Sequence, residues 1–221
     1  MLPCVEEIEV PFTPAALTAS VHGSGDTAVI LGHGAGGDRR TPFLVRMAER
    51  LGGSGRRAVL YNFPYTEARR KLPDRPEILE GACVAVAEHV RRALGAARVV
   101  HGGKSMGGRI ASQAVAKGAP ADALVFLGYP LHPPGRPEML RDRHLPGIVA
   151  PMLFLQGTRD SFARWDLIEG VVRTLGPRAM LHRVEGGDHS FVVPRKSGRS
   201  TAEAEEEIAA TLLDWLARHG L

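Results

Sequence analysis

Residues 103–107 of this chain read Gly-Lys-Ser-Met-Gly, a G-x-S-x-G motif. The apolar run 98–102 before the motif predicts a strand, and the pattern of residues 108–116 after it predicts a helix. A serine between a strand and a helix in this motif is typical of the nucleophile elbow, a sharp turn that holds the serine hydroxyl above the edge of a sheet. We therefore expect Ser105 to occupy such a turn.

The two glycines of the motif explain why the turn can be so sharp. Gly103 and Gly107 lie two residues on either side of Ser105, where a larger side chain would clash. Gly-Lys-Ser at 103–105 also looks like the end of a phosphate-binding loop, but that loop requires glycine at position 98, where this chain has Arg98. The elbow interpretation is therefore favoured, and it depends on finding an acid and a histidine further along the chain.

The rest of the chain predicts an α/β fold. Alternating apolar residues at 7–12 and 17–21 are typical of two half-buried strands in a hairpin, and short apolar strands then alternate with helical patterns. Strands are expected at 28–31, 58–61, 99–100, 123–127, 152–155 and 180–184, and helices at 42–51, 78–94, 108–116, 166–175 and 202–216. This order predicts a single domain over residues 1–221, with about seven to eight mostly parallel strands between two layers of helices.

Composition excludes several classes of protein. The 44% hydrophobic and 24% charged residues are those of an ordinary soluble protein, and the net charge of +4 is slight. Basic pairs are scattered without interleaved aromatic residues, so no nucleic-acid surface is predicted. No stretch approaches the roughly 20 apolar residues of a membrane span, so no membrane association is expected.

The chain start and the cysteines predict a cytoplasmic protein. Glu6 and Glu7 stand where a signal peptide would have basic residues, and no apolar segment follows them. Cys4 and Cys83 lie in different contexts, so we expect two free thiols rather than a disulfide framework. No Cys/His spacing typical of zinc is present, and neither a metal nor another cofactor is expected.

The loop after the expected strand 28–31 has two possible functions. Residues 32–37 contain G-x-G-x-x-G, a dinucleotide-binding pattern, but that function requires an acid at the end of the next strand, where residues 61–64 read Tyr-Asn-Phe-Pro. Residues 33–36 also read H-G-x-G, which is typical of an oxyanion loop. In that interpretation, which we favour, the backbone N–H groups of Ala35 and Met106 form the oxyanion hole, and His33 braces the loop.

Two more strand ends carry the expected acid and base. Asp160 follows the strand 152–155, and His189 lies in a glycine-rich loop after the last strand. Asp166 is a rival acid that looks more like a helix N-cap, and Asp188 would point away from its neighbour His189. Ser105, Asp160 and His189 thus appear in the chain order of an α/β-hydrolase, so we predict a catalytic triad of these residues.

Six motifs together carry a family resemblance: LGHGAGGD at 31–38, YNFPY at 61–65, GGKSMGGR at 102–109, LGYPLHPP at 127–134, FLQGTRD at 154–160 and GGDHSF at 186–191. Over nearly its whole length the chain resembles the α/β-hydrolase superfamily, in its dienelactone-hydrolase-like branch. It looks closest to small bacterial hydrolases without a large lid, which are similar to a testis-expressed mammalian protein and to a domain in a subunit of a histone-acetyltransferase complex. The resemblance implies a three-layer α/β-hydrolase fold with Ser105 as nucleophile, His189 as base and Asp160 as its orienting acid. True dienelactone hydrolases have cysteine in place of Ser105, so dienelactone is not the expected substrate.

The residues that contact the substrate are less well defined. The loops 62–76 and 128–146 are too short for a full helical lid, and their candidate substrate-binding residues are Phe63, Tyr65, Tyr129 and His132. Packing of the loops onto the domain explains these side chains equally well. The same loops contain six basic residues, which either favour an anionic acyl group or are simply solvated, the second being preferred: Arg69, Arg70, Lys71, Arg136, Arg141 and Arg143.

These observations predict a serine hydrolase that acts on a small carboxylic ester or thioester through an acyl-enzyme intermediate. The expected partner is a small-molecule acyl substrate, and the chain is expected to be a monomer or a homodimer. The alternative is a non-catalytic protein-interaction module that keeps the hydrolase fold. An intact Ser105, Asp160 and His189 set argues against the alternative, because a scaffold needs none of these groups.

Overall fold

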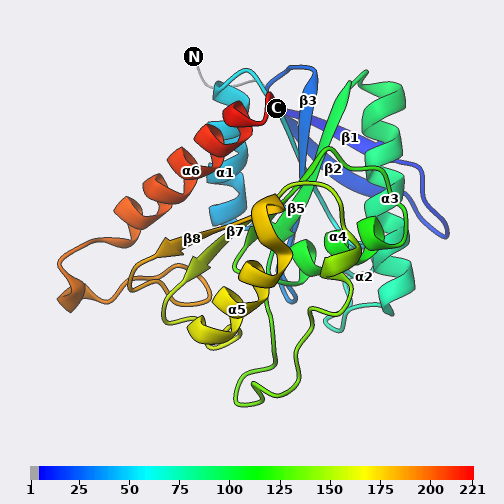
Figure 1. The fold of residues 1–221 in the computed structure, drawn as a ribbon. Helices are drawn as coiled ribbons and strands as arrows, with labels where there is room; N and C mark the ends of the chain where they lie inside the picture. The colour runs from blue at the N-terminus through cyan, green and yellow to red at the C-terminus, as the bar shows by residue number, and fades with distance from the viewer. Residues whose placement is uncertain (1–4) are drawn as a thin grey trace.

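The computed structural model describes residues 5–221, which contain an eight-stranded sheet in the order β1-β2-β4-β3-β5-β6-β7-β8 (Figure 1). Cys4 and the first residues of the acidic chain start lie outside the described residues. β1 and β2 form an antiparallel hairpin, β2 pairs antiparallel with β4, and all other neighbours are parallel, which confirms the predicted mostly parallel sheet. The strands are β1 Val5–Val10, β2 Leu17–His22, β3 Thr27–Gly32, β4 Arg57–Tyr61, β5 Arg98–Lys104, β6 Ala123–Leu127, β7 Met152–Gly157 and β8 Ala179–Val184.

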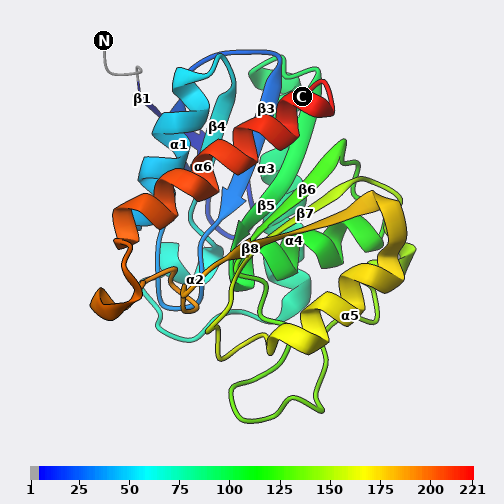
Figure 2. The same ribbon diagram turned by 60° about the vertical axis from the view of Figure 1, so that its left-hand side comes forward.

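Helices cover both faces of the sheet, as expected (Figures 1 and 2). The helices are α1 Pro42–Gly53, α2 Pro64–Glu67, α3 Pro76–Ala93, α4 Met106–Ala116, α5 Trp165–Leu175 and α6 Thr201–Arg218. Three short 3-10 turns lie at Leu145–Gly147, Gly176–Arg178 and Arg195–Ser197. In the described chain, none of the helices is long and apolar enough to cross a membrane.

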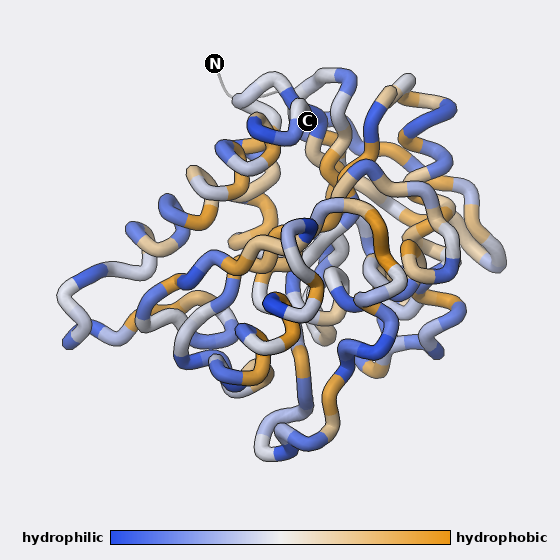
Figure 3. Tube along the Cα trace, in the orientation of Figure 1, coloured by the Kyte–Doolittle hydropathy of each residue, from blue (hydrophilic) through white to orange (hydrophobic). Residues whose placement is uncertain are grey.

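The two-residue period of the strands divides the core into two layers. Val29 and Leu31 of β3 pack with α1 and α6, whereas Ala28 and Ile30 point to the other face and pack with α3. Because helices cover both faces, the inner strands β3, β4 and β6 are buried and apolar along most of their length, as in other parallel sheets, whereas the edge strands β1 and β8 are partly exposed (Figure 3). The core therefore holds the strand ends at fixed positions, and these ends carry the candidate site.

Local sequence signals explain where the helices begin. α1, α2 and α3 each have proline in the first turn, and α6 begins with a capping box in which Ser200 and Glu203 bond each other's backbone N–H groups. The expectation that Asp166 is an N-cap is wrong, because α5 begins one residue earlier and Arg164 holds the N-cap position. Asp166 lies in the first turn, where its carboxylate is ion-paired with Arg164 at 2.7 Å.

The connections above the carboxyl ends of the strands are short or irregular. Between β4 and α3 the described chain forms only the four-residue helix α2, and between β6 and β7 it forms only the 3-10 turn Leu145–Gly147. Neither connection forms a helical cap, in agreement with the expected absence of a large lid. No helix of these two connections therefore covers the strand ends in the described chain.

Candidate active site

Ser105 occupies a strained turn between β5 and α4. Its backbone angles are φ 52° and ψ −114°, a region that residues other than glycine rarely adopt. The backbone N–H of Ser105 donates a hydrogen bond to the carbonyl of Leu127 at 3.1 Å, so the pairing of β5 with β6 continues into the turn. This is the strand–turn–helix geometry that the motif predicts.

The glycines of the motif are required because the turn packs directly on the end of β3. A Cβ at Gly103, where φ is +149°, would lie 2.3 Å from the carbonyl oxygen of Gly32. A Cβ at Gly107 would lie 2.1 Å from the same oxygen. Both distances are far shorter than any real Cβ contact, so the steric reason given for the two glycines is confirmed, and Gly32 is the residue that causes the crowding.

Ser105, His189 and Asp160 form one hydrogen-bonded chain. The Nε2 atom of His189 lies 2.8 Å from Ser105 Oγ, and its Nδ1 atom lies 2.7 Å from Asp160 Oδ2. The side chain of Asp160 is fully buried, whereas that of His189 keeps 19% of its surface exposed. The three residues come from the ends of β5, β7 and β8, and they meet because the carboxyl ends of parallel strands share one edge of the sheet.

Two groups that the sequence analysis did not single out hold the Asp160 carboxylate. Gln156 Nε2 donates to Oδ2 at 2.6 Å, and the backbone N–H of Phe162 donates to Oδ1 at 2.7 Å. The amide of Gln156 is oriented in turn by the N–H of Tyr129, which donates to Gln156 Oε1 at 2.8 Å. Gln156 is the one polar side chain in the apolar strand β7, a signal that could have identified it.

The imidazole of His189 is held from its face and through its loop. The Phe162 ring stacks on it at a centroid distance of 4.2 Å and an interplanar angle of 28°. Asp188 Oδ1 accepts hydrogen bonds from the N–H groups of Ser190 and Val192, so its carboxylate is used inside the loop rather than by His189, as expected. Because the Asp188 carboxylate is occupied within the loop, Asp160 is the acid that bonds the imidazole.

The glycine loop after β3 lies beside Ser105. A Cβ at Gly34 would lie 3.6 Å from Ser105 Cβ, and a turn closes with a hydrogen bond from Gly37 N–H to the Gly34 carbonyl at 3.1 Å. Within residues 5–221 the backbone N–H groups of Ala35 and Met106 have no hydrogen-bond acceptor. Met106 is also the first residue of α4, and the N-terminal end of a helix favours negative charge.

His33 braces this loop rather than reaching toward Ser105. The N–H of Phe63 donates to His33 Nε2 at 3.2 Å, so Nδ1 carries the proton and donates to the Gly34 carbonyl at 2.8 Å. Burial lowers the pKa of His33, which keeps the ring neutral and preserves this tautomer. The bracing role expected for His33 is therefore confirmed.

The four candidate substrate-binding side chains are buried: Phe63, Tyr65, Tyr129 and His132. The Tyr129 hydroxyl donates to the Arg141 carbonyl at 2.7 Å, and His132 Nε2 accepts from the Arg164 N–H at 2.8 Å. Packing therefore describes the observed contacts of Phe63, Tyr129 and His132, and their contact with a substrate stays a prediction. Their aromatic and imidazole character could not distinguish the two roles, because both use apolar contact area.

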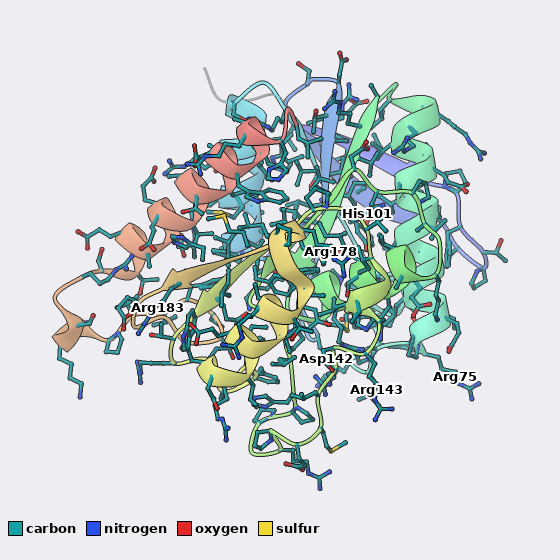
Figure 4. All side chains as sticks on the ribbon, viewed as in Figure 1. Arg75, His101, Asp142, Arg143, Arg178 and Arg183 are labelled. Carbon is teal, nitrogen blue, oxygen red and sulfur yellow. The ribbon has the colours of Figure 1, made fainter. Side chains whose placement is uncertain are left out.

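Tyr65 borders a cavity of about 710 Å³ beside the glycine loop. The cavity starts at Gly36 and Gly37, and four basic residues line it together with one acid: Arg40, Arg69, Arg70, Lys71 and Asp38. Arg70 is also ion-paired with Asp74 at 2.5 Å. Arg143 lies elsewhere, exposed on the connection between β6 and β7 (Figure 4).

The sequence pattern of a family described as the α/β-hydrolase domain matches residues 25–217. The chain belongs to the α/β-hydrolase family. This α/β-hydrolase has the fold of a dienelactone hydrolase from Anabaena variabilis, with a TM-score of 0.76, 20% identity and 99% of each chain covered. A serine hydrolase without a lid from Xanthomonas campestris gives a TM-score of 0.75 at 19% identity over 96% of this chain and 94% of that one. An esterase from Pyrococcus furiosus gives 0.76 at 16% identity over 98% and 90% of the two chains.

Proposed function

We propose that this α/β-hydrolase is a serine hydrolase that cleaves a small carboxylic ester or thioester through an acyl-enzyme. The observation that carries the proposal is the chain of hydrogen bonds from Asp160 through His189 to Ser105 Oγ. The strained turn at Ser105 supports it, because strained backbone is concentrated at functional sites. The structures with a similar fold include an esterase from Pyrococcus furiosus and a serine hydrolase from Xanthomonas campestris, which agrees with this chemistry.

In the proposed reaction, Ser105 Oγ attacks the acyl carbonyl carbon while His189 Nε2 takes the hydroxyl proton. Asp160 accepts the hydrogen bond of Nδ1–H, which fixes the tautomer that leaves Nε2 free to act as a base. The proton on Nε2 then passes to the leaving alcohol or thiol as its bond to the acyl carbon breaks. In the second step His189 Nε2 takes a proton from water as the water oxygen attacks the acyl carbon. The bond from that carbon to Ser105 Oγ then breaks, the proton passes from Nε2 to Oγ, and the acid is released.

The backbone N–H groups of Ala35 and Met106 are proposed to bind the negative oxygen that forms during both steps. Both are free of other acceptors within the described chain, and they come from the two loops that meet at Ser105. Removal of one such donor costs on the order of 3 kcal/mol of transition-state stabilisation. Every step uses groups of this chain and water, so the proposal includes no metal or organic cofactor.

The experiment is a panel of short p-nitrophenyl esters and acyl thioesters, assayed with wild type, Ser105→Ala and Ser190→Ala. Ser190 is an exposed serine next to His189, so its variant controls for the removal of a hydroxyl near the site. Hydrolysis by wild type and Ser190→Ala but not by Ser105→Ala is the expected result. A folded wild type that turns over no member of the panel would favour the alternative, a non-catalytic interaction module.

A further inference from the structure

Lys104, the residue before Ser105, reaches the loop that carries His189. Its Nζ donates a hydrogen bond to the backbone carbonyl of His189 and lies 5.5 Å from the centroid of the Phe191 ring. The ammonium fits there because residue 128 is glycine: a Cβ at Gly128 would lie 3.1 Å from Nζ. The end of β5 and the turn after it thus contact His189 twice, through the Lys104 ammonium and through the Ser105 hydroxyl.

A lysine in this place is chemically unusual. A buried ammonium is costly unless charge or hydrogen bonds compensate for its lost hydration. Burial lowers the pKa of Lys104 to about 8, although the carboxylates of Asp160 and Asp188 act in the opposite direction. Within residues 5–221 the Nζ atom of Lys104 makes one hydrogen bond, to the His189 carbonyl. This bond is therefore the main hydrogen-bonding interaction of the buried ammonium.

The imidazole of His189 is held by Asp160 and Phe162, both from the segment after β7, and the other hydrogen bonds of its loop do not reach β5. Those of Asp188 to Ser190 and Val192 are internal to the loop. The N–H of Arg159, in the turn after β7, donates to the Gly187 carbonyl at 2.9 Å. Among the hydrogen bonds of residues 5–221, the Lys104 bond alone joins the His189 backbone to β5, the strand that leads into Ser105. The Lys104 bond therefore adds a direct link between the segment that leads into Ser105 and the backbone that carries the imidazole.

We infer that Lys104 is a positioning residue whose ammonium holds the His189 carbonyl and thereby keeps the imidazole within reach of Ser105. The inference rests on the proposed function, in which His189 is the base. The groups that face the ammonium are Asp160 from the loop after β7, Asp188 and His189 from the loop after β8, and the uncharged Phe191 ring. When Lys104 loses its proton, the charge-assisted bond weakens, so reaction of Ser105 slows as pH rises above about 8.

The test measures the rate of Ser105 phosphonylation by a fluorophosphonate against pH, in wild type, Lys104→Met and Lys104→Arg. Lys104→Met replaces the ammonium by an apolar group of similar length, and a displacement of the imidazole by about 1 Å slows the reaction on the order of 100-fold. Lys104→Arg keeps the charge, so it is expected to retain the rate at pH 7 and to lose the decline above pH 8. Lys117→Met, which removes an exposed lysine paired with Glu80, is the matched control.

A second measurement separates positioning from a general loss of structure. Replacing a buried charge by an apolar group is often neutral or stabilising, so Lys104→Met is expected to unfold at the same or a higher temperature than wild type while it reacts more slowly. The ester KM should change little, because the lysine acts through His189. If one variant does not fold, the other carries the test through its pH profile.

Three results would overturn the inference. The first is that Lys104→Met is phosphonylated as fast as wild type. The second is that the phosphonylation rate of both variants declines above pH 8 as it does in wild type. If wild type itself is not phosphonylated, the proposed function fails, and NMR of the His189 ring decides the positioning role separately. In that case a His189 Nδ1–H signal that is unchanged in Lys104→Met contradicts the inference, and one that is lost or exchanges faster supports it.

Discussion

The Cα of Gly107 lies against the last residue of β3, so that a Cβ at position 107 would be 2.1 Å from the Gly32 carbonyl oxygen. The helix α4 therefore begins in direct backbone contact with the strand that leads into the glycine loop. This contact brings Ser105 and Gly34 together, because each lies two residues from the crowded point. The same packing that strains the turn thus assembles the candidate site.

Gly107→Ala is expected to destabilise the protein, because α4 must move away from β3 to admit the methyl group. Overpacking of this kind costs about 1–3 kcal/mol or more. Gly170→Ala is the matched control, since nothing lies within 4 Å of the added Cβ in the middle of α5. It should stabilise by roughly 0.5–1 kcal/mol through helix propensity. Urea unfolding measures both, and equal stability of the two variants would show that the contact is not tight.

Asp160→Asn is expected to lower kcat by about 10⁴-fold, because an amide cannot hold the Nδ1–H tautomer of His189. Asp166→Asn removes the rival acid, which is exposed and paired with Arg164, and should leave kcat unchanged. The comparison is made with whichever ester the wild type hydrolyses fastest. A large effect of Asp166→Asn together with a small one of Asp160→Asn would reverse the assignment of the acid.

The buried His101 of β5, labelled in Figure 4, should make stability depend on pH. Burial lowers its pKa to about 4 from 6.5, so between these values the unfolded chain binds a proton that the folded protein does not. The contribution of His101 to the free energy of unfolding is fully present above pH 6.5 and decreases as the pH falls toward 4. At pH 5 the loss is about 2 kcal/mol.

The check is the free energy of unfolding at pH 7 and pH 5 for wild type and His101→Gln. The variant removes the titrating group from the core, so its stability should decrease less between the two pH values. His89→Gln, on the partly exposed side of α3, is the control and should follow wild type. If His101→Gln loses as much stability as wild type, another group causes the acid sensitivity.

The basic cavity beside the glycine loop predicts a preference for esters with a carboxylate on the acyl chain. A hemisuccinate should have a higher kcat/KM than the butyrate of the same alcohol, and added salt should reduce the difference. Arg69→Asn removes one charge at a position with φ +53°, which asparagine tolerates, and should lower the ratio by roughly fivefold, equivalent to about 1 kcal/mol. Arg136→Asn is the control outside the cavity. Solvated arginines, the interpretation preferred from sequence, would leave the ratio unchanged.

Much of the fold could be predicted because its signals are local. Apolar runs and helical periods located the strands and helices within a few residues, and proline or glycine marked their ends. The grouping of Ser105, Asp160 and His189 followed from one rule, that carboxyl ends of parallel strands meet.

Contacts that depend on how one loop docks on another could not be predicted. In the sequence, Lys104 stands out only as part of the rejected phosphate-loop pattern. Its bond to His189 could not be predicted, because it joins segments 85 residues apart. Phe162 gave no signal, since an aromatic residue after Asp160 could equally pack into the core. The burial of Tyr129 and His132 could not be predicted either, because it depends on the path of the connection between β6 and β7.

The most direct test of the central claim is the intact mass of the folded protein after reaction with a fluorophosphonate, compared between wild type and Ser105→Ala. The account predicts a single adduct on wild type, mapped to the peptide that contains Ser105, and none on the variant. Absence of an adduct on folded wild type, or an adduct of equal yield on Ser105→Ala, would contradict it.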